Sequence, residues 1–374
     1  MDLSYTEEQN LLRNSLQRFV DNSYDINHRN ALTTTEEGFS RENWQQYADL
    51  GWLAMSFAEE DGGIGGTPVD TQVMMEEFGK GLIVEPFLAS IVMAGTALSE
   101  AGSAAQKEAL IPGLVDGSLI ATVAIAEPDT HQEFERINMT AALKGGEYTL
   151  SGQKAVVLNA QSANHIIVAA RTSGQDADHD GISFFIVAAD SKGLSRKDFP
   201  TVDGLRASDL TFDNVKVPAE NLLGEEGKGY ALLTKILNRT ILALSAEAVG
   251  AMEVLYKDTI AYTKQREQFD HALSDFQVLK HRMTEMFVEY SLAKSLTLKA
   301  TMLETQGSEE TQRTIHALKY LIGKTSRFVA QNAVQLHGGM GMTEELRVAH
   351  YFKRLTVIDA MFGNTDYHLE RFVA

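Results

Sequence analysis

The segment Gln335-Leu336-His337-Gly338-Gly339-Met340-Gly341-Met342 closes a stretch rich in Ala, Val and Gln at helical spacing. Glycine occupies three of the four positions from 338 to 341. Glycine lets the backbone come close to another group and leaves amide N–H groups uncovered. A lone Gly-Gly pair would usually mark only the end of a helix. The segment therefore predicts a turn at which the backbone is closely approached by another group.

The composition is that of an ordinary globular protein with a strong acidic excess. The 374 residues contain 44% hydrophobic and 22% charged residues, and the formal net charge is -18. Such a charge disfavours nucleic acid and anionic membranes, whose binding needs basic surface. An anionic small ligand remains possible if Lys or Arg side chains surround it. Cysteine is absent, which excludes disulfides and thiolate metal sites.

The N-terminus gives no targeting signal. Residues 1–8, Met-Asp-Leu-Ser-Tyr-Thr-Glu-Glu, lack the basic start and apolar core of a signal peptide. No stretch of 18 apolar residues is present, so no membrane insertion is expected. The sequence therefore predicts a cytoplasmic protein.

The pattern of the chain changes twice, which predicts three domains: 1–118 helical, 119–225 β and 226–374 helical. In the first, Thr6-Glu7-Glu8-Gln9 is a capping-box pattern. Two helical faces are expected there, one of Leu11, Leu12, Leu16 and Phe19, the other of Trp44, Tyr47, Leu50 and Leu53.

The second segment has short runs typical of strands, and the third has long helical runs. The expected strands are 122–125, 148–150, 155–158, 165–168 and 182–187, which suit a small barrel or sandwich. The expected helices are 232–263, 276–306 and 309–336, which suit an antiparallel four-helix bundle. The predicted fold is multi-domain α+β, in the order helical, β, helical.

This order and six short motifs resemble the acyl-CoA dehydrogenase family over essentially the whole chain. The motifs are Glu59-Glu60-Asp61-Gly62-Gly63, Ala126-Glu127-Pro128, Leu150-Ser151-Gly152-Gln153-Lys154, Arg266-Glu267-Gln268-Phe269, Phe276-Gln277 and Gln335-Leu336-His337-Gly338-Gly339. The closest resemblance is to small subunits of bacterial pimeloyl-CoA-type dehydrogenases. The resemblance implies FAD as cofactor, an acyl-CoA substrate and an electron-transfer flavoprotein as partner. It also implies an oligomer in which a neighbouring subunit completes the FAD site.

The resemblance assigns cofactor contacts to two groups of residues. Residues matching Arg266, Phe269 and Gln277 contact the ADP half of FAD, and Gln335, Gly338 and Gly339 match pyrophosphate contacts. An Arg side chain offers phosphate a planar fork of donors, and Phe offers an apolar wall. The alternative for Arg266 is a surface ion pair with Glu267 or Asp270. Asp270 and Ala272 stand where the family usually has Gly and Pro, so the backbone of this loop is expected to differ from that of relatives.

The β domain departs from the family at two places near the expected flavin. The loop 129–133 reads Asp-Thr-His-Gln-Glu, where relatives have Gly and Ser. Val156, Val157 and Leu158 stand where relatives have Trp-Ile-Thr. An apolar wall is kept, but the indole and the hydroxyl are lost.

The family's catalytic base is absent from both of its usual positions. Those positions are Phe362 and Thr240, and neither side chain can accept the α-proton of a thioester. Glu247 lies seven residues after Thr240, within about 20° of the same helix face and roughly 10 Å along it. Glu247 is the candidate base, and its alternative role is an ion pair across a helix interface. Asp366 is the second candidate, and its alternative is a helix cap.

Two functions follow from these residues. The first is a FAD-dependent acyl-CoA dehydrogenase that forms trans-2-enoyl-CoA, assembled as a homo-oligomer. The second is a non-catalytic or half-site small subunit that forms a heteromer with a related large subunit. Flavin oxidase or monooxygenase chemistry on the same fold is also open. His337 and His350 lack spaced partners, so a structural role is expected for both and no metal site is predicted.

Overall fold

The computed structural model describes residues 5–130 and 132–374. Residues 1–4 and His131, which belongs to the loop quoted above, lie outside the described residues. Contacts divide the chain into two compact units. We call Met1–Ala31, Pro68–Ile83 and Ile241–Ala374 the helical unit, and Leu32–Thr67 and Val84–Thr240 the sheet unit. The units interleave along the sequence, and the three-domain boundaries at 118/119 and 225/226 stay a prediction.

The sheet unit begins with short helices and continues into an eight-stranded sheet, as far as the structure describes it. The helices are α3 (Arg41–Asp49), η1 (Glu59–Asp61), the π-helical η2 (Leu88–Ala94), α5 (Gly95–Ala101) and α6 (Ala104–Val115). The strands are β1 (Ala121–Ala124), β2 (Thr140–Lys144), β3 (Glu147–Leu158), β4 (His165–Arg171), β5 (Ile182–Ala188), β6 (Leu194–Pro200), β7 (Arg206–Pro218) and β8 (Leu222–Leu223). Their order is β6-β7-β3-β2-β4-β5-β8, and β1 pairs in parallel with β4. Two single turns, η3 (Ala160–Ser162) and η4 (Ala219–Asn221), connect strands.

The long strand β3 corrects the prediction of two separate strands at 148–150 and 155–158. Its pairing with β7 shifts register between Leu150 and Gly152 and again between Lys154 and Val157. Gly152 and Val156 have positive φ, at 148° and 52°. These bulges interrupt the alternation of side chains, so one strand reads as two in the sequence.

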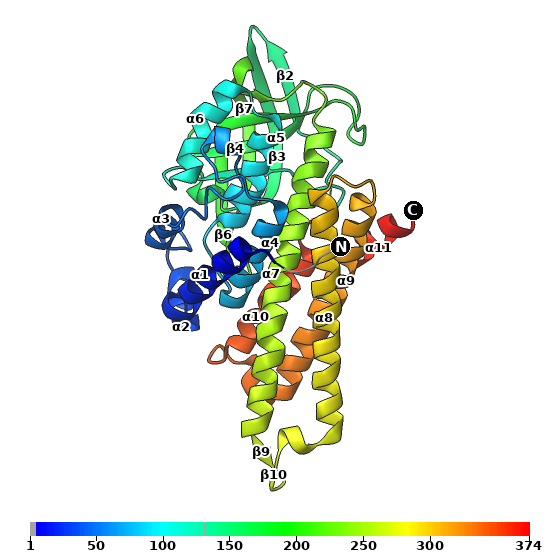
Figure 1. The fold of residues 1–374 in the computed structure, drawn as a ribbon. Coiled ribbons are helices and arrows are strands. Elements are labelled where there is room, and N and C mark those ends of the chain that lie inside the picture. The colour runs from blue at the N-terminus through cyan, green and yellow to red at the C-terminus, as the bar shows by residue number, and fades with distance from the viewer. Residues whose placement is uncertain (1–4, 131) are drawn as a thin grey trace. The chain divides into compact units, whose positions relative to one another are not determined.

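The helical unit contains the three long helices expected from the sequence. They are α7 (Tyr230–Gln265, of which Ile241 onward belongs to this unit), α8 (Gln277–Thr305) and α9 (Thr311–His337). Figure 1 shows α7 and α8 side by side, joined at one end by the hairpin of β9 (Glu267–Gln268) and β10 (His271–Ala272). The short η5 (Leu273–Asp275) leads into α8, and η6 (Gly338–Met342), α10 (Arg347–Ala360) and α11 (Thr365–Val373) complete the C-terminal bundle.

The N-terminal part of this unit consists of α1 (Glu7–Ser23), most of α2 (Ile26–Thr33) and α4 (Pro68–Gly81). Thr6 and Gln9 form the predicted capping box at the start of α1. Leu16 and Phe19 are buried as expected, but Leu11 is 63% exposed. In the sheet unit, Leu50 is likewise 47% exposed, because it follows the end of α3.

Two glycines let α4 and α7 cross with their backbones in contact. A Cβ atom on Gly79 would lie 2.0 Å from the carbonyl oxygen of Glu247, and one on Gly250 would lie 1.9 Å from that of Glu76. Only glycine fits at such a crossing, because every other side chain would overlap the neighbouring backbone.

Buried acids on α4 are paired with cations from neighbouring helices. Glu76 pairs with Lys294 of α8 at 3.2 Å, and Glu77 pairs with Arg13 of α1 at 3.1 Å. Glu253 of α7 accepts a hydrogen bond from Tyr290 of α8 at 3.1 Å and lies 3.5 Å from Lys80. These pairs join α4, α7 and α8. Among the described residues, no helix combines the length and the apolar character needed to span a membrane.

Candidate functional site

A cavity of about 870 Å³ lies at the end of α9 in the helical unit. Four of the predicted cofactor residues line it: Arg266, Gln335, Gly338 and Gly339. They come from two segments of sequence, the end of α7 and the end of α9, which the fold brings to the same end of the bundle. Gln335, Gly338 and Gly339 are exposed.

The three glycines of the opening motif have different roles. Gly338 has a φ of 63°, and its N–H donates to the carbonyl of Gln335, which ends α9. A Cβ atom on Gly338 or Gly339 would have no neighbour within 4 Å. One on Gly341 would lie 2.8 Å from the carbonyl oxygen of Val334. Gly341 is thus required for packing, whereas the other two leave an open stretch of backbone facing the cavity.

Arg282 of α8 also lines the cavity, although the sequence did not single it out. Neither Arg266 nor Arg282 has a side-chain hydrogen bond or ion pair to any residue that the structure describes. The predicted alternative for Arg266, an ion pair with Glu267 or Asp270, is therefore not observed. The cavity lining includes no Asp or Glu, so its charge is positive.

His337 has a structural role at the wall of the cavity. Its ring stacks on Tyr262 with centroids 4.3 Å apart, and its Nδ1 lies 2.8 Å from the carbonyl oxygen of Ala333. Burial lowers the pKa of His337. His350 is also buried, with Nε2 3.3 Å from the carbonyl oxygen of Glu344. In the described residues, no three His, Cys, Asp or Glu side chains are grouped so that they could hold a metal ion.

Phe269 and Gln277 do not line this cavity. Phe269 and Asp270 form the two-residue turn between β9 and β10, with φ of 56° and 62°. Two positive φ values are the geometry of a type I′ hairpin, and Asp tolerates it well. Phe269 is 85% exposed, and its ring meets that of Phe276 edge-on at a centroid distance of 6.3 Å. The hairpin therefore presents an apolar ring to its surroundings.

Glu247 is buried, but its surroundings differ from the apolar ones expected. Both of its carboxylate oxygens accept hydrogen bonds from Arg354 of α10, at 2.5 and 2.7 Å. Glu247 is 5% exposed and Arg354 is 4% exposed. The sequence alternative, an ion pair across a helix interface, is thus what the structure contains. Arg354 lies 107 positions further along the chain, so helix periodicity around Glu247 did not reveal it.

The turn at Phe362, one of the two positions that the resemblance assigns to the base, has an unusual backbone conformation. Phe362 and Gly363 have φ of 53° and 97°. Lys319 of α9 donates to the carbonyl oxygens of Asp359 and Gly363, at 2.9 and 2.7 Å. Burial, opposed by the charge of Asp359, lowers the pKa of Lys319 to about 8. His368 contacts the carbonyl oxygen of Phe362 at 2.9 Å.

Asp366, the second candidate base, lies exposed in the first turn of α11. The alternative role of Asp366 as a helix cap is wrong, because Asn364 is the cap. The Asn364 side chain accepts a hydrogen bond from the N–H of Tyr367 at 2.9 Å. The Asp366 side chain therefore does not cap α11.

In the sheet unit, the motif residues Glu127 and Lys154 form a buried pair at 2.7 Å. Glu127 also accepts from the backbone N–H groups of Asn138 and Met139. Burial lowers the pKa of Lys154 to about 8, against the opposing effect of Glu127. Val156, at the second bulge, is 54% exposed. It presents an apolar side chain at the position where the resemblance leads us to expect Trp.

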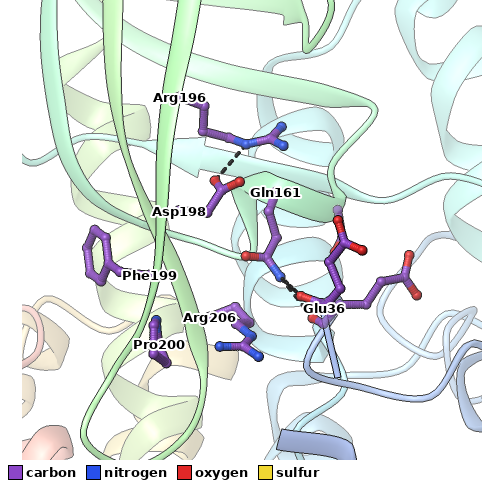
Figure 2. Close-up of a pocket in the computed structure, with 9 residues that line it drawn as sticks. Glu36, Gln161, Arg196, Asp198, Phe199, Pro200 and Arg206 are labelled. Carbon is purple, nitrogen blue, oxygen red and sulfur yellow. Dashed lines mark hydrogen bonds and ion pairs between the residues drawn. The ribbon is translucent and has the colours of Figure 1, made fainter. Parts of the chain in front are cut away.

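A second cavity, of about 470 Å³, lies in the sheet unit and is shown in Figure 2. Its cations are already paired. Arg196 bonds Asp198 at 2.7 Å, and Arg206 donates to the carbonyl oxygens of Thr33 and Thr35. Figure 2 also shows Gln161 reaching the backbone of Glu36. This cavity is therefore lined by both acids and arginines, and its arginines already have partners, unlike those of the cavity at the end of α9.

Comparison with known protein families identifies the fold. Three family models match in order: the N-terminal domain of acyl-CoA dehydrogenase over residues 6–118, the middle domain over 122–215 and the C-terminal domain over 227–374. The chain belongs to the acyl-CoA dehydrogenase family. The fold predicted from the sequence, helical, β and helical, is confirmed.

Individual relatives and solved structures match along nearly the whole chain. The short-chain specific acyl-CoA dehydrogenase of Clostridium acetobutylicum is 29% identical, over 98% of this chain and 97% of the relative. The solved structure named PigA with FAD and proline has 26% identity and a TM-score of 0.92, covering 100% of this chain and 98% of that one. The Tcur3481-Tcur3483 steroid ACAD G363A variant has 28% identity and a TM-score of 0.89, covering 98% and 97%.

Proposed function

We propose that this chain acts in the FAD-dependent oxidation of an acyl-CoA thioester to trans-2-enoyl-CoA. The observation that carries the proposal is the cavity at the end of α9, with open glycine backbone, two unpaired arginines and no carboxylate. These features fit the diphosphate of FAD, because exposed amides and guanidinium groups bind phosphate oxygens. Arg266, Gln335, Gly338 and Gly339 would hold that diphosphate. A solved structure of the same fold is named FAD complex of PigA.

Phe269 and Gln277 are proposed as contacts for the adenine side of FAD. Phe269 is exposed on the hairpin, as a residue that serves a neighbouring subunit's cofactor must be. When bound, FAD supplies the acceptor for the hydride that leaves the substrate's β carbon. The part left to the protein is removal of the α-proton, which needs a positioned base.

Glu247 is the proposed base, and its ion pair with Arg354 limits how it can accept the α-proton. Arg354 takes one lone pair of each carboxylate oxygen, so Glu247 must accept the proton on a remaining lone pair beside the guanidinium group. Asp366 is the second candidate, because its carboxylate is exposed and free of capping.

Anaerobic mixing of the purified protein with acyl-CoA tests both assignments. With Glu247→Gln, loss of flavin bleaching at unchanged flavin content is the expected result. Normal bleaching in Glu247→Gln together with loss in Asp366→Asn would transfer the role to Asp366. Normal bleaching in both variants would remove the base from this chain.

The half-site small subunit is a second candidate, favoured by the same ion pair. A buried carboxylate that is paired with Arg, together with Phe362 at one of the expected base positions, suits a chain whose partner supplies the base. The name of the Tcur3481-Tcur3483 relative joins two designations, which suits a two-chain enzyme. Purification of this chain alone with stoichiometric flavin would contradict the half-site function.

Several finer assignments stay proposals on the same basis. They are the relation to pimeloyl-CoA-type small subunits, transfer of electrons to an electron-transfer flavoprotein, assembly as a homo-oligomer or heteromer, and a cytoplasmic location. The spectrum of the purified chain before and after adding acyl-CoAs of different lengths addresses the substrate.

A further inference from the structure

We infer that Arg282 is a second phosphate-binding cation in the cavity at the end of α9, acting with Arg266 on the diphosphate of an ADP-containing ligand. The inference rests on the proposed function and adds a residue to the site that neither the motifs nor the comparisons assign. It depends on three features: the face of α8 that lines the cavity, the absence of a partner for Arg282 and the charge of the lining.

The geometry of α8 directs Arg282 into the cavity. Val278, Leu279 and Arg282 all line it, and they stand three and four residues apart. Residues at this spacing share one face of a helix. The apolar residues therefore form the wall, and Arg282 supplies a charge one turn further along the same face.

Arg282 is free to bind a ligand. It is exposed, and no hydrogen bond or ion pair of its side chain is found within residues 5–130 and 132–374. An Arg side chain that serves stability usually has a carboxylate or carbonyl partner, as Arg354 and Arg206 have here. Two unpaired arginines facing one cavity repel each other, and an anion between them removes this repulsion.

The charge of the lining selects for an anion. The chain has a net charge of -18, so a site for a phosphate ligand must concentrate cations locally. The cavity at the end of α9 has two free arginines and no acid. The sheet-unit cavity has three acids, Glu36, Glu37 and Asp198, beside its arginines. Only the first of these two has the composition of a phosphate site.

The ligand class follows from the remaining lining residues. Gly338 and Gly339 offer open backbone, and Val278, Leu279 and Met340 offer apolar surface. A diphosphate joined to a planar base matches both. The planar fork of Arg282 would bind one phosphate while Arg266 binds the other.

Arg282→Gln tests the inference, with Lys280→Gln as the control. Lys280 is exposed on the same helix, does not line the cavity and loses the same charge when changed to Gln. Titration calorimetry of the flavin-stripped full chain measures the affinities for FAD and for ADP. Loss of one charged hydrogen-bonding group is expected to weaken both by about 10- to 100-fold in Arg282→Gln. Lys280→Gln should change neither more than about twofold, and Arg282→Lys should recover part of the loss.

The two ligands separate failure of this inference from failure of the proposed function. If wild type and Arg282→Gln bind FAD and ADP equally well, the inference is wrong and the proposed function stands. If wild type binds ADP in an Arg282-dependent way but does not bind FAD, the inference stands and the proposed cofactor is wrong. If wild type binds neither, both are wrong.

Discussion

Buried charges in this chain are held by particular partners. Lys154 and Lys319 are fully buried, and each donates to a backbone carbonyl: Ile125 for Lys154 and Gly363 for Lys319. Because every donor of such a group costs free energy if left unpaired, these contacts fix the backbone that provides the carbonyls. Lys319 thereby holds the turn at Phe362, although Phe362 itself cannot act as a base.

The Glu247–Arg354 pair leads to a prediction about stability. Arg354→Met should destabilise the protein by about 3–5 kcal/mol, because the carboxylate of Glu247 would be buried without a partner. The double variant Glu247→Met/Arg354→Met should recover most of this loss, since no charge then remains buried. Urea unfolding of the two single variants and the double variant measures the coupling. Additive losses would show that the two side chains stabilise the fold independently.

The candidate site could be predicted from sequence only where its residues form short motifs. The Gln335–Gly339 and Arg266–Phe269 segments are contiguous, and the structure brings Arg266, Gln335, Gly338 and Gly339 to one cavity. Arg282 follows Lys280 and His281 in the sequence, so no local pattern distinguishes it from a solvated surface residue. Arg354 was missed as a partner for a different reason, because it contacts Glu247 only through helix packing.

Secondary structure was predictable where one periodicity continues over many residues. The long helices α7, α8 and α9 lie within two residues of their expected limits, because three or more turns carry the same pattern. Strands β2, β6, β7 and β8 were not predicted. In β6 the middle residues are exposed and polar, so its burial does not alternate cleanly. Pairing with β7 supplies its hydrogen bonds, and that partner is not visible locally.

The crossing of α4 and α7 predicts that a Gly→Ala substitution destabilises the protein, although helix propensity alone predicts the opposite. Alanine favours a helix over glycine by roughly 0.5–1 kcal/mol. Gly79→Ala should nevertheless destabilise the protein by about 1–3 kcal/mol, because the new methyl group would overlap the backbone of Glu247. Gly81→Ala, on the same helix, meets only the side chains of Val20 and Ile83 and is the control. Thermal unfolding compares them, and an equal effect of both substitutions would exclude a tight crossing.

The ion pairs between α4, α7 and α8 predict a pH dependence. Burial disfavours the charged form of Glu253, but the hydrogen bond from Lys257 and the charge of Lys80 outweigh it and lower its pKa to about 2. A lowered folded-state pKa stabilises the fold above the unfolded value of 4.5, and this stabilisation is lost as the pH falls from 4.5 toward 2.

Glu253→Gln should therefore cost about 2–3 kcal/mol at pH 7 and progressively less below pH 4.5. Urea unfolding from pH 7 to pH 3 measures the difference between variant and wild type. Glu344→Gln, which removes a largely exposed pair with Lys353, should cost less than about 0.5 kcal/mol throughout. A difference for Glu253→Gln that stays constant down to pH 3 would contradict the lowered pKa.

The interleaving of the two units could not be read from the order of the segments. Pro68–Ile83 belongs with Ile241–Ala374 through the glycine crossing and the buried acids, although about 160 residues of the sheet unit separate them in sequence. A prediction made along the chain groups residues that are neighbours in sequence. The predicted domain 1–118 therefore placed α4 with the residues on either side of it. Net charge, in contrast, is a property of the entire chain that the sequence gives completely.

The net charge of -18 leads to a prediction about how an anionic ligand reaches the cavity. At low salt the whole protein repels the diphosphate of FAD, while Arg266 and Arg282 attract it only at short range. Raising the salt concentration from 10 to 150 mM shortens the screening length from about 30 to about 8 Å, which weakens distant repulsion more than contact attraction. The association rate constant of FAD should therefore rise with salt, whereas that of uncharged riboflavin should stay constant. Stopped-flow flavin fluorescence measures both, and an FAD rate constant that falls with salt would show that the two arginines dominate the field at long range.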